Sequence, residues 1–275
     1  MSGTIVASRS REVVIGFDQP FRVIGERINP TGRRRLTDDL LSGSFAQVLA
    51  EASAQARAGA EILDVNVGVA SPDPETTEPP LLARAVEAIQ SALDPPLAID
   101  SRFPRAIEAG LAVALGRPLL NSVSGEEDSL ERLLPLAAKL GVPVIALCRD
   151  AAGVPADPDA RFEIARHIIA RAADHGIARD DIIVDPLAMP ASVAGTDAGT
   201  VLRLIARLGR ELQVNTVVGL SNISFGLADR APLNAAFLKS AIAAGLTAAI
   251  MDPLGAEMAV ARAARRSGAR RPEMR

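Results

Sequence analysis

One strand–helix–strand unit runs without a break through residues 119–148, LLNSVSGEEDSLERLLPLAAKLGVPVIALC. Its two ends, Leu119–Val123 and Val144–Cys148, are apolar runs of strand length. Between them, Ser129–Leu140 has the Leu- and Ala-rich pattern of an amphipathic helix. Gly141 follows at the position where helices commonly end in a left-handed residue. Strands separated by such a helix are typical of parallel pairing.

The same alternation extends in both directions along the chain. The predicted strands are Val23–Ile28, Ile62–Val67, Leu97–Asp100, Leu119–Val123, Val144–Cys148, Ile182–Asp185, Thr216–Leu220 and Ala248–Met251. The predicted helices are Phe45–Ala58, Pro80–Leu93, Pro104–Ala114, Ser129–Leu140, Ala160–His175, Gly199–Leu212 and Leu233–Ala244. An open, doubly wound sheet shows this alternation too, but eight strands in a chain of barrel size favour the α/β class with a single (β/α)8 TIM barrel.

The pattern has no linker-like interruption, so one domain is expected. We place it at residues 22–262, after an N-terminal extension at 1–21 and before a basic C-terminal tail at 263–275. The basic stretch from Arg262 to Arg275 is expected to be frayed.

Composition excludes several classes of protein. The 275 residues carry a net charge of −3, with no Trp or Tyr, which argues against nucleic-acid and anionic-membrane partners. A single Cys and two His exclude a disulfide framework and a Cys-rich metal site. The first residues lack the pattern of a secretory signal, and no apolar run reaches membrane-spanning length. A cytoplasmic protein is expected.

Polar side chains gather at the carboxyl ends of the predicted strands. Seven of the eight ends carry Glu, Asp or Asn; they include Glu26, Asp64, Asn66, Asp100, Asn121, Asp185, Asn222 and Asp252. Taken singly, an Asp after a strand is as readily a helix cap or a turn residue. In a barrel, however, these ends converge on the face where active sites are built.

Two kinds of ligand fit such a face. Carboxylates accept paired N–H donors and Asn both donates and accepts, which suits a heterocycle with an amidine-like edge, such as a pterin or guanine. A divalent metal held by Asp64, Asp100 and Asp185 is the alternative. Cys148 ends a strand with no His at a strand end to activate it, so a core thiol is favoured. His167 and His175 are expected on a helix surface.

The motifs at these strand ends resemble those of a known family. They read Ile24-Gly25-Glu26-Arg27-Ile28-Asn29-Pro30-Thr31-Gly32, Leu63-Asp64-Val65-Asn66-Val67-Gly68, Ile99-Asp100-Ser101, Leu120-Asn121-Ser122, Val184-Asp185-Pro186-Leu187 and Gly219-Leu220-Ser221-Asn222-Ile223-Ser224-Phe225-Gly226, followed by Arg230 and Leu233-Asn234. From about residue 22 to 256 the chain is similar to the methyltetrahydrofolate:corrinoid protein methyltransferases and to the folate module of cobalamin-dependent methionine synthase.

The resemblance implies a fold and a set of roles. The fold is a pterin-binding, dihydropteroate-synthase-like barrel. Asp100, Asn121 and Asp185 match the residues that hydrogen-bond the pterin edge, and Asn222 matches the one that approaches N5, where the methyl group is carried. Asp100 and Asn222 are therefore the catalytic candidates. Glu26, Asp64, Asn66 and Arg230 match other polar positions of the pocket, and no metal is bound by the chain itself.

The implied reaction moves a methyl group between N5 of methyltetrahydrofolate and the cobalt of a corrinoid. The chain lacks the Asp-x-His-x-x-Gly motif of a cobalamin carrier, since Asp174-His175-Gly176 has the wrong spacing. The corrinoid is therefore expected on a separate protein, and a homodimer is implied because dimers are usual among relatives.

Two features of the sequence leave alternatives open. Phe225 occupies a position that is polar in some relatives, which is compatible with a subgroup using another partner or with a non-catalytic folate-binding protein. Arg33-Arg34-Arg35 is either a solvated charge run or a contact for the glutamate tail of a folate. A dihydropteroate synthase is the nearest rival; it needs a cation for its pyrophosphate leaving group, and Ser221-Asn222-Ile223-Ser224 offers none.

Overall fold

A computed structural model describes residues 3–190 and 198–267 of the chain. Within these ranges, eight parallel strands form a closed barrel in the order β10-β3-β4-β5-β6-β7-β8-β9. Their bounds are Arg22–Ile28 (β3), Ile62–Asn66 (β4), Leu97–Asp100 (β5), Leu119–Ser124 (β6), Val144–Leu147 (β7), Ile182–Asp185 (β8), Asn215–Gly219 (β9) and Ala248–Met251 (β10). The predicted (β/α)8 barrel is confirmed.

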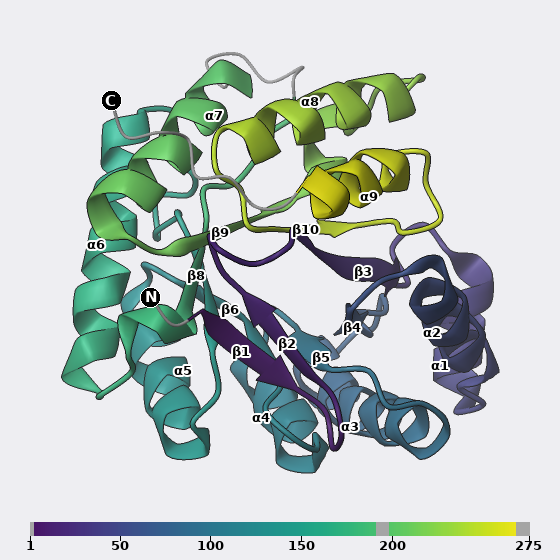
Figure 1. Ribbon diagram of the computed structural model, residues 1–275. Helices are drawn as coiled ribbons and strands as arrows, with labels where there is room; N and C mark the ends of the chain where they lie inside the picture. Colours follow the sequence, from purple (N-terminus) through teal and green to yellow (C-terminus); the bar gives the residue numbers. More distant parts are fainter. Residues whose placement is uncertain (1–2, 191–197, 268–275) are drawn as a thin grey trace.

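Helices surround the barrel as an outer layer (Figure 1). They are Arg34–Ser42 (α1), Ala46–Ala58 (α2), Pro74–Ala92 (α3), Pro104–Val113 (α4), Glu127–Leu140 (α5), Pro158–Asp174 (α6), Ala198–Arg207 (α7), Ala231–Ala243 (α8) and Met258–Ser267 (α9). Short 3-10 turns cover Arg179–Asp181 (η1) and Leu220–Ser224 (η3), and a π turn, Leu208–Leu212 (η2), follows α7. None of the described helices is long and apolar enough to cross a membrane.

The barrel interior is a separate apolar core. Every strand contributes one buried side chain to it: Ile24, Ile62, Ala98, Leu119, Ile145, Ile183, Val217 and Ala248. The register pairs them side by side, for example Ile24 with Ile62 and Ile145 with Ile183. Inward-pointing branched residues in layers are what fills a barrel of this size, so the interior is packed and forms no channel.

An antiparallel hairpin, Thr4–Ala7 (β1) and Glu12–Ile15 (β2), closes the amino-terminal end of the barrel (Figure 1). Val6 and Ile15 are fully buried against the interior core. Asn215 at the start of β9 donates its Nδ2 to the Thr4 hydroxyl and to the Ile15 carbonyl, both at 2.9 Å. The segment expected only as an extension is thus part of the packed core.

Helix α9 runs through Ser267, so the expectation that the chain frays from Arg262 onward is wrong for residues 262–267. Arg265 holds this helix against the amino-terminal end of the barrel, where strands β3 and β4 begin. Its guanidinium donates to the carbonyls of Phe21 and Gly59, each at 3.1 Å, and forms an ion pair with Glu61 at 2.5 Å. The rest of the expected tail, residues 268–275, lies outside the described residues.

Candidate active site

Three neighbouring strands present a row of polar side chains at their carboxyl ends. The parallel register places Asn66 beside Asp100, and Asp100 beside Asn121. Adjacent residues of paired strands point to the same face, so the three side chains lie at one level of the barrel mouth. Asp64, two residues before Asn66, lies one layer deeper on the same strand face. The convergence predicted from the sequence is therefore present for this group.

Hydrogen bonds join these four residues into one network. Asn66 donates its Nδ2 to Asp100 Oδ2, and Asn121 donates its Nδ2 to Asp64 Oδ1, both at 2.9 Å. Burial raises the pKa of Asp64 well above its usual range, and the negative charge of Asp100 raises it further. Burial raises the pKa of Asp100 to about 6, while hydrogen bonds from Asn66 and Asp64 hold it down. Of this pair, Asp64 is therefore the proton donor in their shared hydrogen bond, and Asp100 is the acceptor.

Asp185 ends β8 on the other side of the barrel mouth. Burial raises the pKa of its carboxyl to about 7, against the lowering effect of backbone N–H groups of Leu187 and Gly219. The Leu187 N–H donates to Asp185 Oδ1 at 2.7 Å, and Leu187 has a φ of +61°, unusual for a residue with a side chain. The carboxylate is thus fixed by the turn that follows it.

A buried arginine secures that turn. Arg161 on α6 is fully buried, and its Nη1 donates to the carbonyls of Pro186 at 3.2 Å and Leu187 at 3.1 Å. Its Nε donates to the Pro155 carbonyl at 2.6 Å. Sequence analysis missed this residue, because it occurs within an expected amphipathic helix with no local sign that its side chain reaches the loop after β8.

Glu26, Ser221 and Arg230 form a second polar group at the mouth. The Ser221 hydroxyl donates to the Glu26 carboxylate, and Arg230 donates its Nη2 to the Ser221 carbonyl at 2.5 Å. Burial raises the pKa of Glu26 to about 7, and its charge in turn helps to raise the pKa of Asp64. The two groups are therefore electrostatic neighbours, although different strands and loops supply them.

Asn222 lies on η3, directly after β9, with its side chain exposed at the mouth. A Cβ on Gly219 would lie 2.9 Å from the Asn222 amide nitrogen, so a larger residue at this position would push the Asn222 side chain aside. Phe225, three residues further on, is 66% exposed. The structure brings Asn222 to the same barrel end as the carboxylates without joining it to their hydrogen-bond network.

A cavity of about 850 Å³ opens beside the network. Asn66, Asp100 and Glu78 line one part of it, and Pro30–Arg34, Val69 and Phe103 line the rest. This volume lies in the range of small-molecule sites. The loops after β3, β4 and β5 form its walls.

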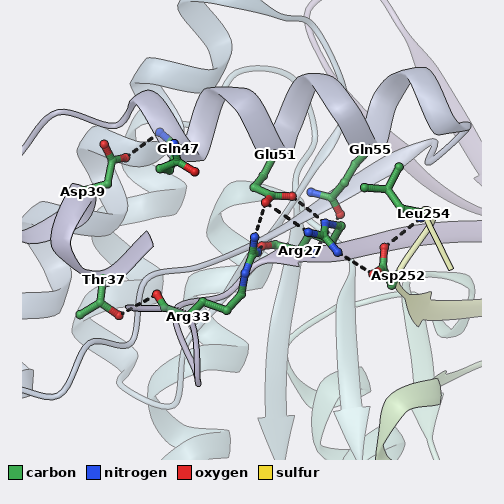
Figure 2. A network of polar contacts seen from close by, with 9 residues as sticks. All are labelled: Arg27, Arg33, Thr37, Asp39, Gln47, Glu51, Gln55, Asp252 and Leu254. Carbon is green, nitrogen blue, oxygen red and sulfur yellow. Dashed lines mark hydrogen bonds and ion pairs between the residues drawn. The ribbon is translucent and has the colours of Figure 1, made fainter. Parts of the chain in front are cut away.

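An ion-pair network fixes the loop after β3, which forms one of those walls (Figure 2). Arg27 pairs with Glu51 of α2 at 2.6 Å and with Asp252 at 2.7 Å. Arg33 pairs with the same Glu51 and donates to the Arg27 carbonyl. Burial opposes ionisation of Glu51, but hydrogen bonds from both arginines outweigh it and lower its pKa. Of the three successive arginines, Arg33 therefore has a structural role, since it ties the loop after β3 to α2.

The cysteine and the two histidines lie outside the polar groups at the barrel mouth. Cys148 is fully buried, and burial raises the pKa of its thiol, as a core position requires. His167 and His175 are exposed at α6 and its end, as expected. Across residues 3–190 and 198–267, no three His, Cys, Asp or Glu side chains are grouped so that they could hold a metal ion.

Comparison with solved structures identifies the fold. Dihydropteroate synthase of Xanthomonas albilineans with 4-aminobenzoic acid superposes with a TM-score of 0.66 and 22% identity, over 95% of this chain and 97% of that one. The Yersinia pestis dihydropteroate synthase gives 0.67 at 18% identity, over 97% and 99% of the two chains. At these identities the likeness extends to the fold alone.

Comparison with sequences identifies the family. The chain is 32% identical over 245 residues to the methylcorrinoid:tetrahydrofolate methyltransferase of Eubacterium limosum, covering 86% of each. It is 30% identical over 261 residues to the methionine synthase of Mycobacterium tuberculosis, but covers only 21% of that protein. The family model described as pterin binding enzyme matches residues 25–252. The chain belongs to the pterin binding enzyme family.

Proposed function

We propose that this protein transfers a methyl group between N5 of methyltetrahydrofolate and the cobalt of a corrinoid carried on a separate protein. The observation that carries the proposal is the row of Asn66, Asp100 and Asn121 at the mouth of a barrel with Asp185 across from it. The sequence likeness to a methylcorrinoid:tetrahydrofolate methyltransferase supports the choice of reaction.

The pterin edge supplies the N–H donors that this mouth needs. Ionised Asp100 and Asp185 each accept from the pyrimidine portion of the ring, and Asn121 both donates and accepts. Hydrogen bonds to a carboxylate favour its ionised form, so pterin binding lowers the raised pKa of both acids. Folate binding is therefore expected to release protons at pH 6 to 7 and to strengthen as the pH rises through that range.

Methyl transfer needs help at N5, because a tertiary amine is a poor leaving group. The methyl group passes to Co(I), which supplies the bonding electron pair, while N5 keeps the electrons of the broken bond and takes up a proton. Asn222 cannot supply that proton at neutral pH, but its exposed amide can donate a hydrogen bond that strengthens as charge develops on N5.

The acceptor must come from outside the chain. One Cys and two His cannot build a zinc-thiol site, and the exposed residues around Asn222 leave the mouth accessible from solvent. A corrinoid protein would dock there transiently, since it must also meet its other methyl donor or acceptor. We further infer that the protein works in the cytoplasm as a homodimer, as the family resemblance implies.

The test is an anaerobic assay with purified protein, methyltetrahydrofolate and cob(I)alamin, followed through the corrinoid spectrum. Protein-dependent formation of methylcobalamin, and the reverse reaction from methylcobalamin and tetrahydrofolate, are the expected results. The Asn222→Ala variant serves as the matched control for pocket-dependent transfer.

Two other outcomes would replace the proposal. Folate binding without transfer, to free cob(I)alamin or to any corrinoid protein supplied, would indicate a non-catalytic folate-binding protein. Condensation of a pterin pyrophosphate with 4-aminobenzoate would indicate a dihydropteroate synthase, although the turn after β9 carries Ser221 and Asn222 where that leaving group needs a cation.

A further inference from the structure

The cavity beside the polar row is lined by two chemically different sets of side chains. One set, Asn66, Asp100 and Glu78, offers acceptors to N–H donors. The other set is a pair of cations, Arg34 on α1 and Arg102 after β5. Glu78 is buried, and burial raises the pKa of its carboxyl, which weakens its repulsion of a nearby anion. A ligand that fills the whole cavity is therefore expected to carry both N–H donors and an anionic group.

The two arginines make few contacts with the described part of the chain, although Arg102 lies close enough to Glu78 for its charge to lower the pKa of that carboxyl. The Arg34 side chain is 94% exposed, and its nearest carboxylate, Asp38, lies 3.8 Å away on the next helical turn. Arg102 is exposed, and its guanidinium stacks on the Phe103 ring with its carbon 4.7 Å from the ring centroid. Stacking fixes the plane of the guanidinium and leaves its edges open to a carboxylate. Arg33, by contrast, is engaged with Glu51.

We propose that Arg34 and Arg102 bind the carboxylates of the folate glutamate tail and make the enzyme selective for glutamylated, and above all polyglutamylated, folates. The inference rests on the proposed function. A folate carries its pterin and its carboxylates at opposite ends of an aromatic linker. With the pterin at Asp100, the linker passes the apolar side chains of Val69 and Phe103, and the tail reaches the arginines.

Arg35 provides a matched control, because it belongs to the same run of arginines and is exposed but does not line the cavity. The experiment measures dissociation constants by calorimetric titration for three ligands: methyltetrahydropteroate without glutamate, methyltetrahydrofolate with one glutamate, and its triglutamate. The proteins are the wild type, Arg34→Gln, Arg102→Gln, the double variant and Arg35→Gln.

Wild type is expected to bind the ligands in the order triglutamate, monoglutamate, pteroate, from tightest to weakest. Each exposed ion pair lost should weaken glutamate-dependent binding by up to about fivefold. The double variant should bind all three ligands alike, and Arg35→Gln should behave as wild type. The preference should also shrink at about 0.5 M salt, because screening weakens exposed ion pairs.

The outcomes separate this inference from the proposed function. Equal affinity of wild type for all three ligands, or a preference that survives in the double variant, would overturn the tail site while leaving the pterin pocket intact. A wild type that binds none of the three would instead overturn the proposed function. Pteroate affinity in the double variant reports directly whether the pterin pocket has been left undisturbed.

Discussion

The two ends of the barrel are built from the same strands but have opposite chemistry. At the amino-terminal end the β1–β2 hairpin buries Val6 and Ile15 against a layer of aliphatic side chains. At the carboxyl-terminal end the strands finish in carboxylates, and burial raises the pKa of Asp100 and Asp185 toward neutrality. One end gains stability from apolar burial; the other retains buried acids that are costly to ionise in the free protein.

Stability and chemistry are therefore assigned to opposite ends of the same barrel. Substitutions at the hairpin should lower stability and leave the rate of methyl transfer unchanged. Substitutions at the carboxyl-terminal mouth should instead impair folate binding or methyl transfer and change stability little.

Ile15→Ala removes a fully buried side chain from the closed end. The free energy of unfolding should fall by about 2–5 kcal/mol, as for other large-to-small changes in a core. Urea unfolding measures the loss, and Val14→Ala, on the less buried face of the same strand, should cost much less. The rate of methyl transfer per folded molecule should stay at the wild-type value; a large drop would break the division between the ends.

Asn222→Ala should slow methyl transfer and leave the stability of the protein unchanged. Loss of a donor that acts mainly in the transition state costs about 2.7–4 kcal/mol, or roughly 100- to 1000-fold in turnover. Single-turnover rates and folate dissociation constants, measured on the same preparation, test whether only the rate falls. Gln213→Ala, at an exposed amide near the closed end, is the control. If rate and affinity fell together, Asn222 would be a binding residue and not an electrophilic helper.

Arg161→Met should affect both properties, since Arg161 couples the helical layer to the loop beside Asp185. Leaving its buried carbonyl partners unpaired should cost about 1–3 kcal/mol of stability. The pKa of Asp185 should rise because a nearby positive charge is lost, so folate affinity should need a higher pH than in wild type. Arg166→Met, on the exposed face of the same helix, should change neither. If the pH dependence of folate affinity were the same in Arg161→Met as in wild type, Arg161 would have a structural role only.

The stability of the ligand-free protein should depend on pH because Asp185, at the carboxyl-terminal end of the barrel, has a raised pKa. Folding raises the pKa of Asp185 from its ordinary 3.8 to about 7, so the stability gained from its protonated form is complete below about pH 4 and is lost as the pH rises through 7. The melting temperature should therefore decline between about pH 4 and 7 and level off above that range, by roughly 2–4 °C for each kcal/mol lost. Asp185→Asn should flatten this decline, whereas Asp174→Asn, exposed on α6, should not. Parallel curves for wild type and Asp185→Asn would contradict the assignment.

Much of this architecture could be predicted from sequence, because strand runs and helical stripes are local signals. All eight barrel strands occur within a residue or two of the predicted bounds. Helix α1 was missed because its apolar positions, Leu36 and Leu40, follow a run of three arginines that resembles a loop. The hairpin was missed because its two antiparallel strands lie outside the alternation of strands and helices and are held in place by contacts with the distant Asn215.

The candidate site shows the same limit. Asp64, Asn66, Asp100 and Asn121 could be grouped because each ends a predicted strand, and strand ends meet in a barrel. Arg161 could not be found, because a residue pattern does not reveal where a buried side chain points. The choice among the three arginines after β3 likewise depended on Glu51, whose helix turns it toward Arg33 (Figure 2).

We propose that the carboxyl-terminal end of the barrel binds the pterin of a folate through its buried acids. Calorimetric titration of methyltetrahydrofolate into wild type, Asp100→Asn and Asp174→Asn tests it most directly. A hydrogen bond to a charged group contributes about 1.5–3 kcal/mol, so Asp100→Asn should bind roughly 10- to 100-fold more weakly while Asp174→Asn binds as wild type does. Equal affinity of all three proteins, or no binding by wild type, would contradict the claim.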